Sequence, residues 1–91
     1  MLEKQITKKI KSYLNSLEGV FVWKTHGNQF SCPGVPDIIG TFKGRLIAVE
    51  VKRPGKVPTK LQQAFIDKLN ATGAISFVAT CVEDVEKELS I

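Results

Sequence analysis

The sequence of 91 residues has few of the side chains that build metal clusters and disulfide frameworks. It contains two cysteines, Cys32 and Cys81, and one histidine, His26. Two cysteines are too few for a disulfide scaffold, and with one histidine they cannot form a closed four-ligand zinc site. A lone histidine also excludes chemistries that require two, such as the HExxH metalloproteases. We expect both cysteines to be free thiols.

Long apolar runs and nucleotide-binding loops are also missing. The longest apolar runs, such as residues 46–49, fall far short of the roughly 20 residues that span a bilayer. Residues 1–14 carry charges every few positions and lack the apolar region of a signal peptide. We therefore expect a cytoplasmic protein with no membrane partner. No GxSxG, Walker or GxGxxG sequence occurs, so carboxylate and lysine chemistry remain.

The composition is that of a globular protein with a basic surface. Hydrophobic residues make up 43% of the chain and charged residues 24%, which fits a single folded domain over residues 1–91. Thirteen Lys and Arg residues against nine Asp and Glu give a net charge of +4. A positive charge suits an acidic partner such as nucleic acid. A chain of this size buries a modest core, so an oligomer would bury more.

Hydrophobic periodicity predicts an α/β fold with the element order α-β-β-β-α-β-α. Helical spacing predicts a helix over residues 2–17, and β-branched and aromatic residues predict strands over 20–24, 37–42, 45–52 and 75–80. Lys43-Gly44 forms the hairpin turn between the second and third strands. Phe21 and Trp23, inside the first strand, are predicted to be core aromatics, with base-stacking platforms as the alternative.

The two later helices have their own start signals. Thr59 opens a helix whose apolar stripe is predicted to comprise Leu61, Ala64, Phe65 and Leu69. A short acidic helix begins at position 82 and turns Val85 and Leu89 inward.

Basic residues cluster around the hairpin and the loop that follows it. The cluster comprises Lys43, Arg45, Lys52, Arg53, Lys56 and Lys60. An anion would bind there. The alternative is an exposed turn that its lysines keep soluble.

Two carboxylates are placed where a strand pairing would bring them together. Alternation along residues 45–52 puts Glu50 and Lys52 on the face of Leu46 and Ala48. A hairpin loop of even length makes Asp37 the direct cross-strand neighbour of Glu50, with Cβ atoms roughly 5 Å apart. Like charges in that position are destabilising unless a cation lies between them.

Such a pair suits a hard divalent cation. Two carboxylates and a backbone carbonyl fit Mg²⁺ or Mn²⁺, which retain waters and accept substrate phosphate. Lys52 could hold the attacking water and balance phosphoryl charge. The alternatives are an ordinary Glu50–Lys52 pair on a solvated strand face and, for Asp37, a turn residue after Pro36.

Three further polar residues have double interpretations. Glu3 lies on the apolar stripe of the first helix. It is either a site residue or an acid that interacts favourably with the helix dipole. Gln62 completes a capping box with Thr59, which can be its whole role. His26 follows a strand, and we assign it no catalytic role.

The residues around the carboxylates resemble a nuclease signature. Pro36-Asp37, a gap of twelve residues and Glu50-Val51-Lys52 resemble the PD-(D/E)xK superfamily. Residues 34–40, 44–53 and 59–62, with a first helix that carries Glu3, are similar to the small VRR-NUC nucleases of phages and prophages. The resemblance covers nearly the whole chain. The name-giving Val-Arg-Arg pattern is absent, with residues 51–53 the nearest string, so the archaeal Holliday junction resolvases are the alternative branch.

The resemblance implies a restriction-endonuclease-like fold, a mixed central sheet flanked by helices, and a Mg²⁺- or Mn²⁺-dependent endodeoxyribonuclease. It implies that Asp37, Glu50 and the Val51 carbonyl hold the metal, that Lys52 positions the water, and that Glu3 and Gln62 support the site. The expected DNA contacts are Lys43, Arg45, Arg53, Lys56 and Lys60.

The resemblance also implies a homodimer that cuts four-way DNA junctions. We expect its interface at residues 25–33, around Phe30, and at the strand containing Phe77. The competing hypotheses are a non-catalytic nucleic-acid-binding module on the same fold, a non-specific DNA nuclease, and a small toxin or anti-defence protein that uses the fold.

Overall fold

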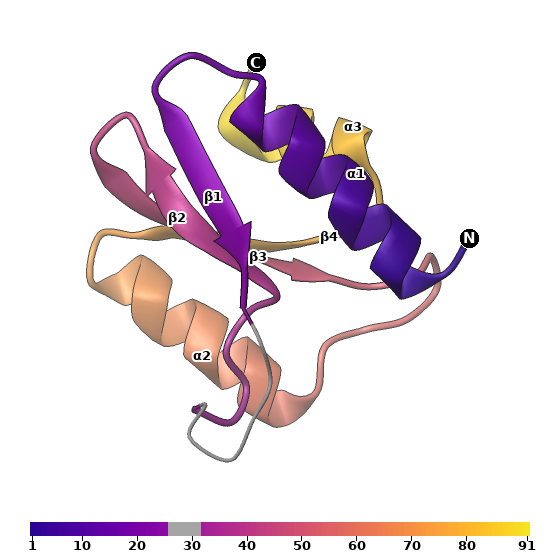
Figure 1. Ribbon diagram of the computed structural model, residues 1–91. Helices are drawn as coiled ribbons and strands as arrows, with labels where there is room; N and C mark the ends of the chain where they lie inside the picture. The colour runs from indigo at the N-terminus through magenta and orange to yellow at the C-terminus, as the bar shows by residue number, and fades with distance from the viewer. Residues whose placement is uncertain (26–31) are drawn as a thin grey trace.

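Three helices pack against a mixed four-stranded sheet (Figure 1). The computed structural model describes residues 1–25 and 32–91. The elements, in chain order, are α1 (Glu3–Asn15), β1 (Val20–Lys24), β2 (Ile38–Phe42), β3 (Arg45–Val51), α2 (Lys60–Ala71), β4 (Ile75–Ala79) and α3 (Val82–Leu89). The predicted order and fold class are confirmed.

The sheet order is β1-β2-β3-β4, antiparallel except for the parallel pair β3–β4. Helices α1 and α3 cover one face, and α2 covers part of the other (Figure 1). The core lies under α1 and α3, where Ile10 and Leu14 of α1 and Val85 of α3 are fully buried. They pack against Ile47 and Val49 of β3. The sheet is therefore better covered on one face than on the other.

An asparagine side chain caps each edge strand. Asn15, at the end of α1, accepts a hydrogen bond from the Val22 amide at 2.8 Å and donates to the Val22 carbonyl at 3.0 Å. Asn70 of α2 makes the same pair of bonds to Ser76 of β4, both at 2.8 Å. Each cap satisfies edge groups that would otherwise be free to pair with another strand.

The expected core positions are wrong on the face that α2 covers. Phe21 is 65% exposed and Trp23 is 48% exposed, because none of the helices in the described residues covers β1 on that side. In α2 the prediction is partly right: Phe65 and Leu69 are half-buried, Leu61 and Ala64 are exposed, and the buried residue is Ile66, which was not predicted. The inward positions predicted for α3 are confirmed, since Val85 is buried and Leu89 packs against the core.

The structure also bears on the predictions for the cysteines and for membrane-spanning segments. Both cysteines are free thiols, as predicted. Within the described ranges, 1–25 and 32–91, no helix is long and apolar enough to cross a membrane.

Candidate active site

The β2–β3 ladder brings Asp37 to Glu50. The two-residue turn pairs Phe42 with Arg45, and the register continues to Ile38 opposite Val49. The next step places Asp37 opposite Glu50, as the sequence predicts. The Asp37 Oδ2 atom accepts a hydrogen bond from the Val51 amide at 2.8 Å. The aspartate side chain therefore takes the place of a ladder bond at the end of the strand pair.

Thr25 holds the backbone of the same segment. Its amide donates to the Asp37 carbonyl at 2.8 Å, and its hydroxyl donates to the carbonyls of Pro36 at 2.8 Å and Asp37 at 3.1 Å. The Pro36 side chain is fully buried. Thr25 is not among the predicted site residues, because a threonine at a strand end carries no distinctive sequence signal.

Glu50 is a buried carboxyl group in an unfavourable environment. The residue is 2% exposed, and its Oε1 atom has no hydrogen-bond partner among the described residues. Burial, followed by the charge of Asp37 and a hydrogen bond with it, raises the pKa of Glu50 to about 8. The positive charge of Lys52 acts in the opposite direction, and Glu3 adds to the increase in pKa.

Lys52 provides the cation of the group. Its Nζ atom lies 3.8 Å from Glu50 Oε2, and its side chain is 15% exposed. Its amide donates to the Ala79 carbonyl at 3.1 Å, which ties the end of β3 to β4. The ammonium group is therefore held beside the carboxylates and in contact with solvent.

The donor set fits a hard divalent cation. A buried carboxylate oxygen without a hydrogen-bond donor is costly, and a bound cation would satisfy it. The N–H and C=O groups of one strand residue point to the same side, so the Val51 carbonyl faces the side from which Asp37 approaches. No group of three or more His, Cys, Asp or Glu side chains that could hold a metal occurs in the described part of the chain. Two carboxylates and one carbonyl suit an ion that keeps several waters, such as Mg²⁺ or Mn²⁺.

Glu3 and Gln62 differ in their relation to this group. Glu3 is the first residue of α1, and its charge raises the pKa of Glu50, so it lies close enough to act on the site. Gln62 accepts a hydrogen bond from the Thr59 amide at 2.8 Å, and Thr59 Oγ1 accepts from the Gln62 amide at 3.2 Å. The capping box predicted for this helix is present.

The basic cluster is divided by the fold. Lys43 and Arg45 lie at the β2–β3 turn, where Lys43 Nζ lies 5.5 Å from the centre of the Phe42 ring and Arg45 Nε donates to Gly73 at 3.0 Å. Arg53, Lys56 and Lys60 follow β3, at the end of the strand that carries Glu50. The seven residues of β3, at about 3.3 Å per residue, separate the two halves by roughly 20 Å. All five side chains are exposed.

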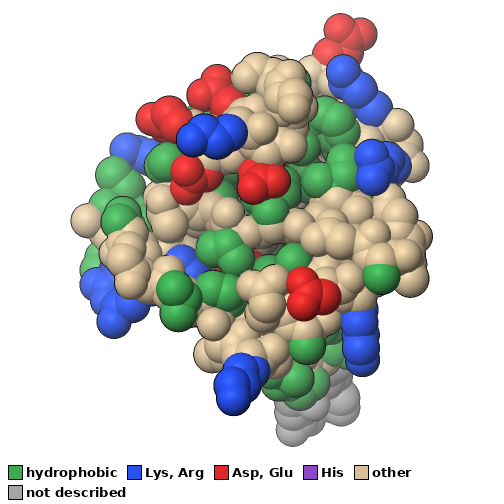
Figure 2. All heavy atoms as spheres, turned by 180° about the vertical axis from the view of Figure 1, so that it is seen from behind, with side chains coloured by type: hydrophobic (Ala, Val, Ile, Leu, Met, Phe, Trp, Pro, Cys, Tyr) green, Lys and Arg blue, Asp and Glu red, His purple; other side chains and the backbone are tan. Residues whose placement is uncertain are grey.

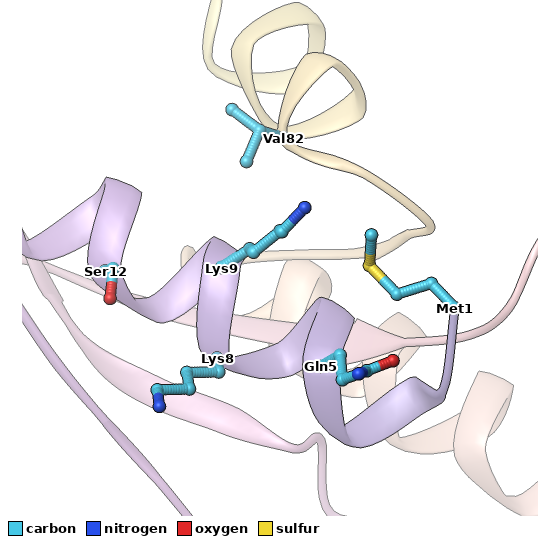
Figure 3. Close-up of a pocket in the computed structure, with 6 residues that line it drawn as sticks. All are labelled: Met1, Gln5, Lys8, Lys9, Ser12 and Val82. Carbon is cyan, nitrogen blue, oxygen red and sulfur yellow. The ribbon is translucent and has the colours of Figure 1, made fainter.

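A cavity on the molecule lies away from these residues. It has a volume of about 850 Å³ and lies between α1 and the start of α3, lined by Met1, Gln5, Lys8, Lys9, Ser12 and Val82 (Figure 3). None of these residues belongs to the predicted site. The predicted dimer positions are also affected: Phe77 is buried in the core, and Phe30 and His26 lie outside the described residues.

Comparisons with known proteins support the sequence resemblance. No family model matches the chain, and no curated protein matches it. A solved structure described as "VRR_NUC domain" is similar over 97% of this chain and 94% of that chain, with 27% identity and a TM-score of 0.77. The predicted resemblance to the VRR-NUC family is confirmed. A second structure, described as "VRR_NUC domain protein", has 18% identity and a TM-score of 0.79 over 99% of this chain and 86% of that chain, and it shares the fold.

Proposed function

We propose that this VRR-NUC-like chain is a divalent-metal-dependent nuclease of the PD-(D/E)xK type. The observation that carries the proposal is the Glu50 carboxylate, which is buried opposite Asp37 with one oxygen unpartnered and Lys52 beside it. This arrangement does not stabilise the fold, because two acids lie together in a poorly solvated position. Such perturbed groups mark functional sites.

Each residue of the group has a distinct proposed role. Asp37, Glu50 and the Val51 carbonyl hold Mg²⁺ or Mn²⁺, which supplies positive charge to the phosphoryl oxygens when bound. The Lys52 ammonium hydrogen-bonds the attacking water and balances charge as the oxygens crowd around phosphorus. The attacking water loses a proton to solvent, and its oxygen forms a bond to phosphorus as the bond to the 3′ oxygen breaks. The leaving 3′ oxygen takes a proton from solvent, which leaves 5′-phosphate and 3′-hydroxyl ends. Glu3 and Gln62 are proposed as positioning residues around this centre.

We propose DNA as the substrate, with four-way junctions as the preferred structure. The net charge of +4 and the exposed residues Arg53, Lys56 and Lys60 beside the site suit a phosphate backbone. Lys43 and Arg45 would contact DNA some distance from the site. A junction has approximate twofold symmetry, so a C₂ homodimer would place two sites for paired cuts. Two free thiols fit a reducing compartment, and we propose that the protein acts in the cytoplasm.

The competing function is a nucleic-acid-binding module that uses the same basic surface without catalysis. A module of this kind would lose DNA affinity steeply with salt and respond to Mg²⁺ only through screening. A binding module of this kind does not explain why Glu50 is buried beside Asp37. A non-specific nuclease would share the chemistry and cut linear duplex as readily as junctions.

The test compares four-way junction, duplex and single-stranded DNA, each incubated with Mg²⁺, Mn²⁺ or EDTA. We expect cleavage that needs the metal and is fastest on the junction. Asp37→Asn, Glu50→Gln and Lys52→Gln should each abolish it. Glu88→Gln and Lys87→Gln, exposed positions of α3, are the charge-matched controls and should keep full activity. A site variant that cleaves normally would overturn the proposed site, and DNA binding without turnover in any metal would favour the binding module.

A further inference from the structure

A groove between α1 and β1 carries four lysines. It has a volume of about 230 Å³ and is lined by Lys4, Lys8, Lys11 and Lys24, together with Thr7. Three of the lysines lie on α1, and the fourth ends β1, the edge strand against which α1 packs. From position 4 to position 11 the helix rises about 10 Å. A DNA duplex carries about six phosphate charges over that length, so the groove is long enough to contact several phosphates.

No carboxylate balances the groove lysines in the described residues, 1–25 and 32–91. The ion pair in this part of the chain joins Lys52 to Glu50, and the residues that line the groove include no acid. The Lys24 ammonium donates to the Thr25 carbonyl at 3.4 Å, which leaves its charge unbalanced. Acidic side chains instead gather in the upper part of Figure 2, where α3 lies. Four unbalanced positive charges around one concave surface favour a polyanion.

The groove lies beside the candidate site but on the other face of the sheet. Lys24 pairs with Ile38, and Ile38 pairs with Val49. Paired residues share a face, and both Ile38 and Val49 are fully buried in the core that α1 covers. Glu50, the residue after Val49, therefore projects to the opposite face. The groove and the carboxylates are close neighbours at one end of the sheet, and they face in opposite directions.

This arrangement distinguishes straight DNA from branched DNA. A duplex is stiff over about 50 nm, so a straight duplex at the carboxylates cannot also turn around the edge of the sheet into the groove. The arms of a branched DNA diverge from one point, and two of them can lie on the two faces. Two contacts that are linked in one ligand can bind about 10²- to 10⁴-fold more tightly than either contact alone.

We propose that the α1–β1 groove binds the phosphate backbone of a second duplex arm of branched DNA, while the first arm lies across the carboxylates. The inference rests on the proposed nuclease function and gives a physical reason why such a nuclease would prefer junctions. It adds the α1 and β1 lysines to the expected DNA contacts, which lie on other elements.

A second copy of the chain is a poorer occupant of the groove. Twofold pairing of two grooves would bring like charges together. Helix α3 of another copy, with Glu83 and Glu88 exposed, is complementary in charge. That contact would be head-to-tail, and it extends into open chains unless the rotation closes a ring.

The test titrates a four-way junction, and a linear duplex as long as two of its arms, against salt in EDTA. Lys8→Gln/Lys11→Gln should lower junction affinity about 60-fold at 0.1 M salt and reduce the slope of log K against log salt by about 1.8, the counterion release expected for two phosphate contacts. Duplex affinity should change little, because a straight duplex at the carboxylates does not reach the groove. Lys8→Gln alone, at an exposed position, should give half of this change in slope.

Lys9→Gln/Lys87→Gln is the matched control, because it removes the same charge from the chain. Lys9 lies on α1 but points toward the α1–α3 cavity, away from Lys8 (Figure 3), and Lys87 is exposed on α3. Both affinities should stay close to those of wild type. Equal losses for junction and duplex, or equal effects of the two double variants, would overturn the proposal.

Two further measurements separate the alternatives. If light scattering without DNA shows a mass that rises at low salt, and Glu83→Gln/Glu88→Gln abolishes the rise, α3 of another copy occupies the groove and the proposal is wrong. A junction-specific loss of affinity in a protein that cleaves no DNA in any metal would reject the nuclease function and keep the groove. Metal-dependent cleavage, with wild-type junction affinity in Lys8→Gln/Lys11→Gln, would reject the groove and keep the nuclease function.

Discussion

The Asp37 carboxylate accepts a hydrogen bond from the Val51 amide at 2.8 Å across the open end of the β2–β3 ladder. One of its oxygens is therefore engaged in holding the strand ends together while the group faces Glu50. This bond gives Asp37 a structural role in addition to its proposed role at the metal. The two roles can be separated by substitutions that differ in whether they keep an oxygen at this position.

Asp37→Asn and Asp37→Ala should both be inactive but should differ in stability. Asparagine keeps an oxygen that can accept from Val51, whereas alanine leaves that amide without its partner. Loss of a hydrogen bond to a charged group costs about 1 to 3 kcal/mol, which exceeds the roughly 0.2 to 1 kcal/mol gained by removing a like-charge pair. In urea denaturation without metal, Asp37→Ala should be less stable than Asp37→Asn. Equal stabilities would contradict the structural role of the Asp37–Val51 bond.

Glu50 should make the metal-free protein less stable as the pH rises. The pKa of Glu50 is raised from 4.5 to about 8 in the folded state, so the unfolded chain releases this proton first. The stabilising contribution of neutral Glu50 is complete below about pH 4.5 and is lost as the pH rises through about 8. Glu50→Gln cannot ionise. The free energy of unfolding of wild type should fall relative to Glu50→Gln between these limits, by an amount on the order of a few kcal/mol.

Thermal or urea unfolding in EDTA at pH 5, 7 and 9 measures this difference. Glu88→Gln is the control, because Glu88 is exposed on α3, and its pH dependence should follow that of wild type. A constant difference between wild type and Glu50→Gln would mean that Glu50 ionises as readily in the folded protein as in the unfolded chain.

Much of this site can be predicted from the sequence, because counting residues outward from a turn gives the register of the two strands. A two-residue turn at Lys43-Gly44 fixes the pairing of β2 with β3, and that pairing brings Asp37 to Glu50. The exposure of Phe21 and Trp23 could not be found in this way. Alternation shows which residues share a face, but it does not show whether a helix covers that face. Of the helices that the structure describes, α2 lies on that side, and it packs against β4 and not against β1.

The basic cluster illustrates a second limit. Lys43 and Lys56 are close in the sequence, but β3 runs between them and puts them at opposite ends of a strand. Lys24 and Lys11 are as far apart in sequence, yet the packing of α1 against β1 brings them into one groove. Charge patterns along the chain therefore locate a surface only where the fold keeps sequence neighbours together.

Gly40 should tolerate no side chain. A Cβ atom there would meet the Phe21 carbonyl oxygen and lie 2.6 Å from Val22 Cα, so the β1 backbone itself would have to move. We expect Gly40→Ala to lose about 3 kcal/mol or more, at the upper end of the range for overpacking. Thr41→Ala, at the next and exposed position, is the control and should change stability by less than about 1 kcal/mol. A well-folded Gly40→Ala protein would show that β1 is free to shift.

The asparagine caps should contribute to stability and protect the sheet edges. Asn15→Ala removes two hydrogen bonds to Val22 and leaves both backbone groups exposed at the edge. We expect a loss of about 1 to 3 kcal/mol and a greater tendency to aggregate. Asn70→Ala should behave alike, because it removes the same pair of bonds to Ser76. Ser12→Ala, on the exposed side of α1, should be close to neutral in urea denaturation and light scattering.

Glu3→Gln should keep measurable cleavage activity but require more metal. The negative charge of Glu3 raises the pKa of Glu50, so the same charge must attract a cation placed between the carboxylates. Two effects oppose each other in the variant. Loss of the charge weakens metal binding, but it also lowers the pKa of Glu50 and so makes that ligand easier to ionise.

Comparison at two pH values separates these effects. At pH 9 Glu50 is largely ionised in both proteins, and the direct loss of attraction remains, so the Mg²⁺ concentration for half-maximal cleavage should rise about 10-fold, as for other residues around a metal site. At pH 7 the easier ionisation of Glu50 offsets part of that loss, and the rise should be smaller. Glu88→Gln should show wild-type Mg²⁺ dependence at both pH values. If Glu3→Gln also shows wild-type Mg²⁺ dependence at both pH values, Glu3 has no part in the site and only interacts with the dipole of α1.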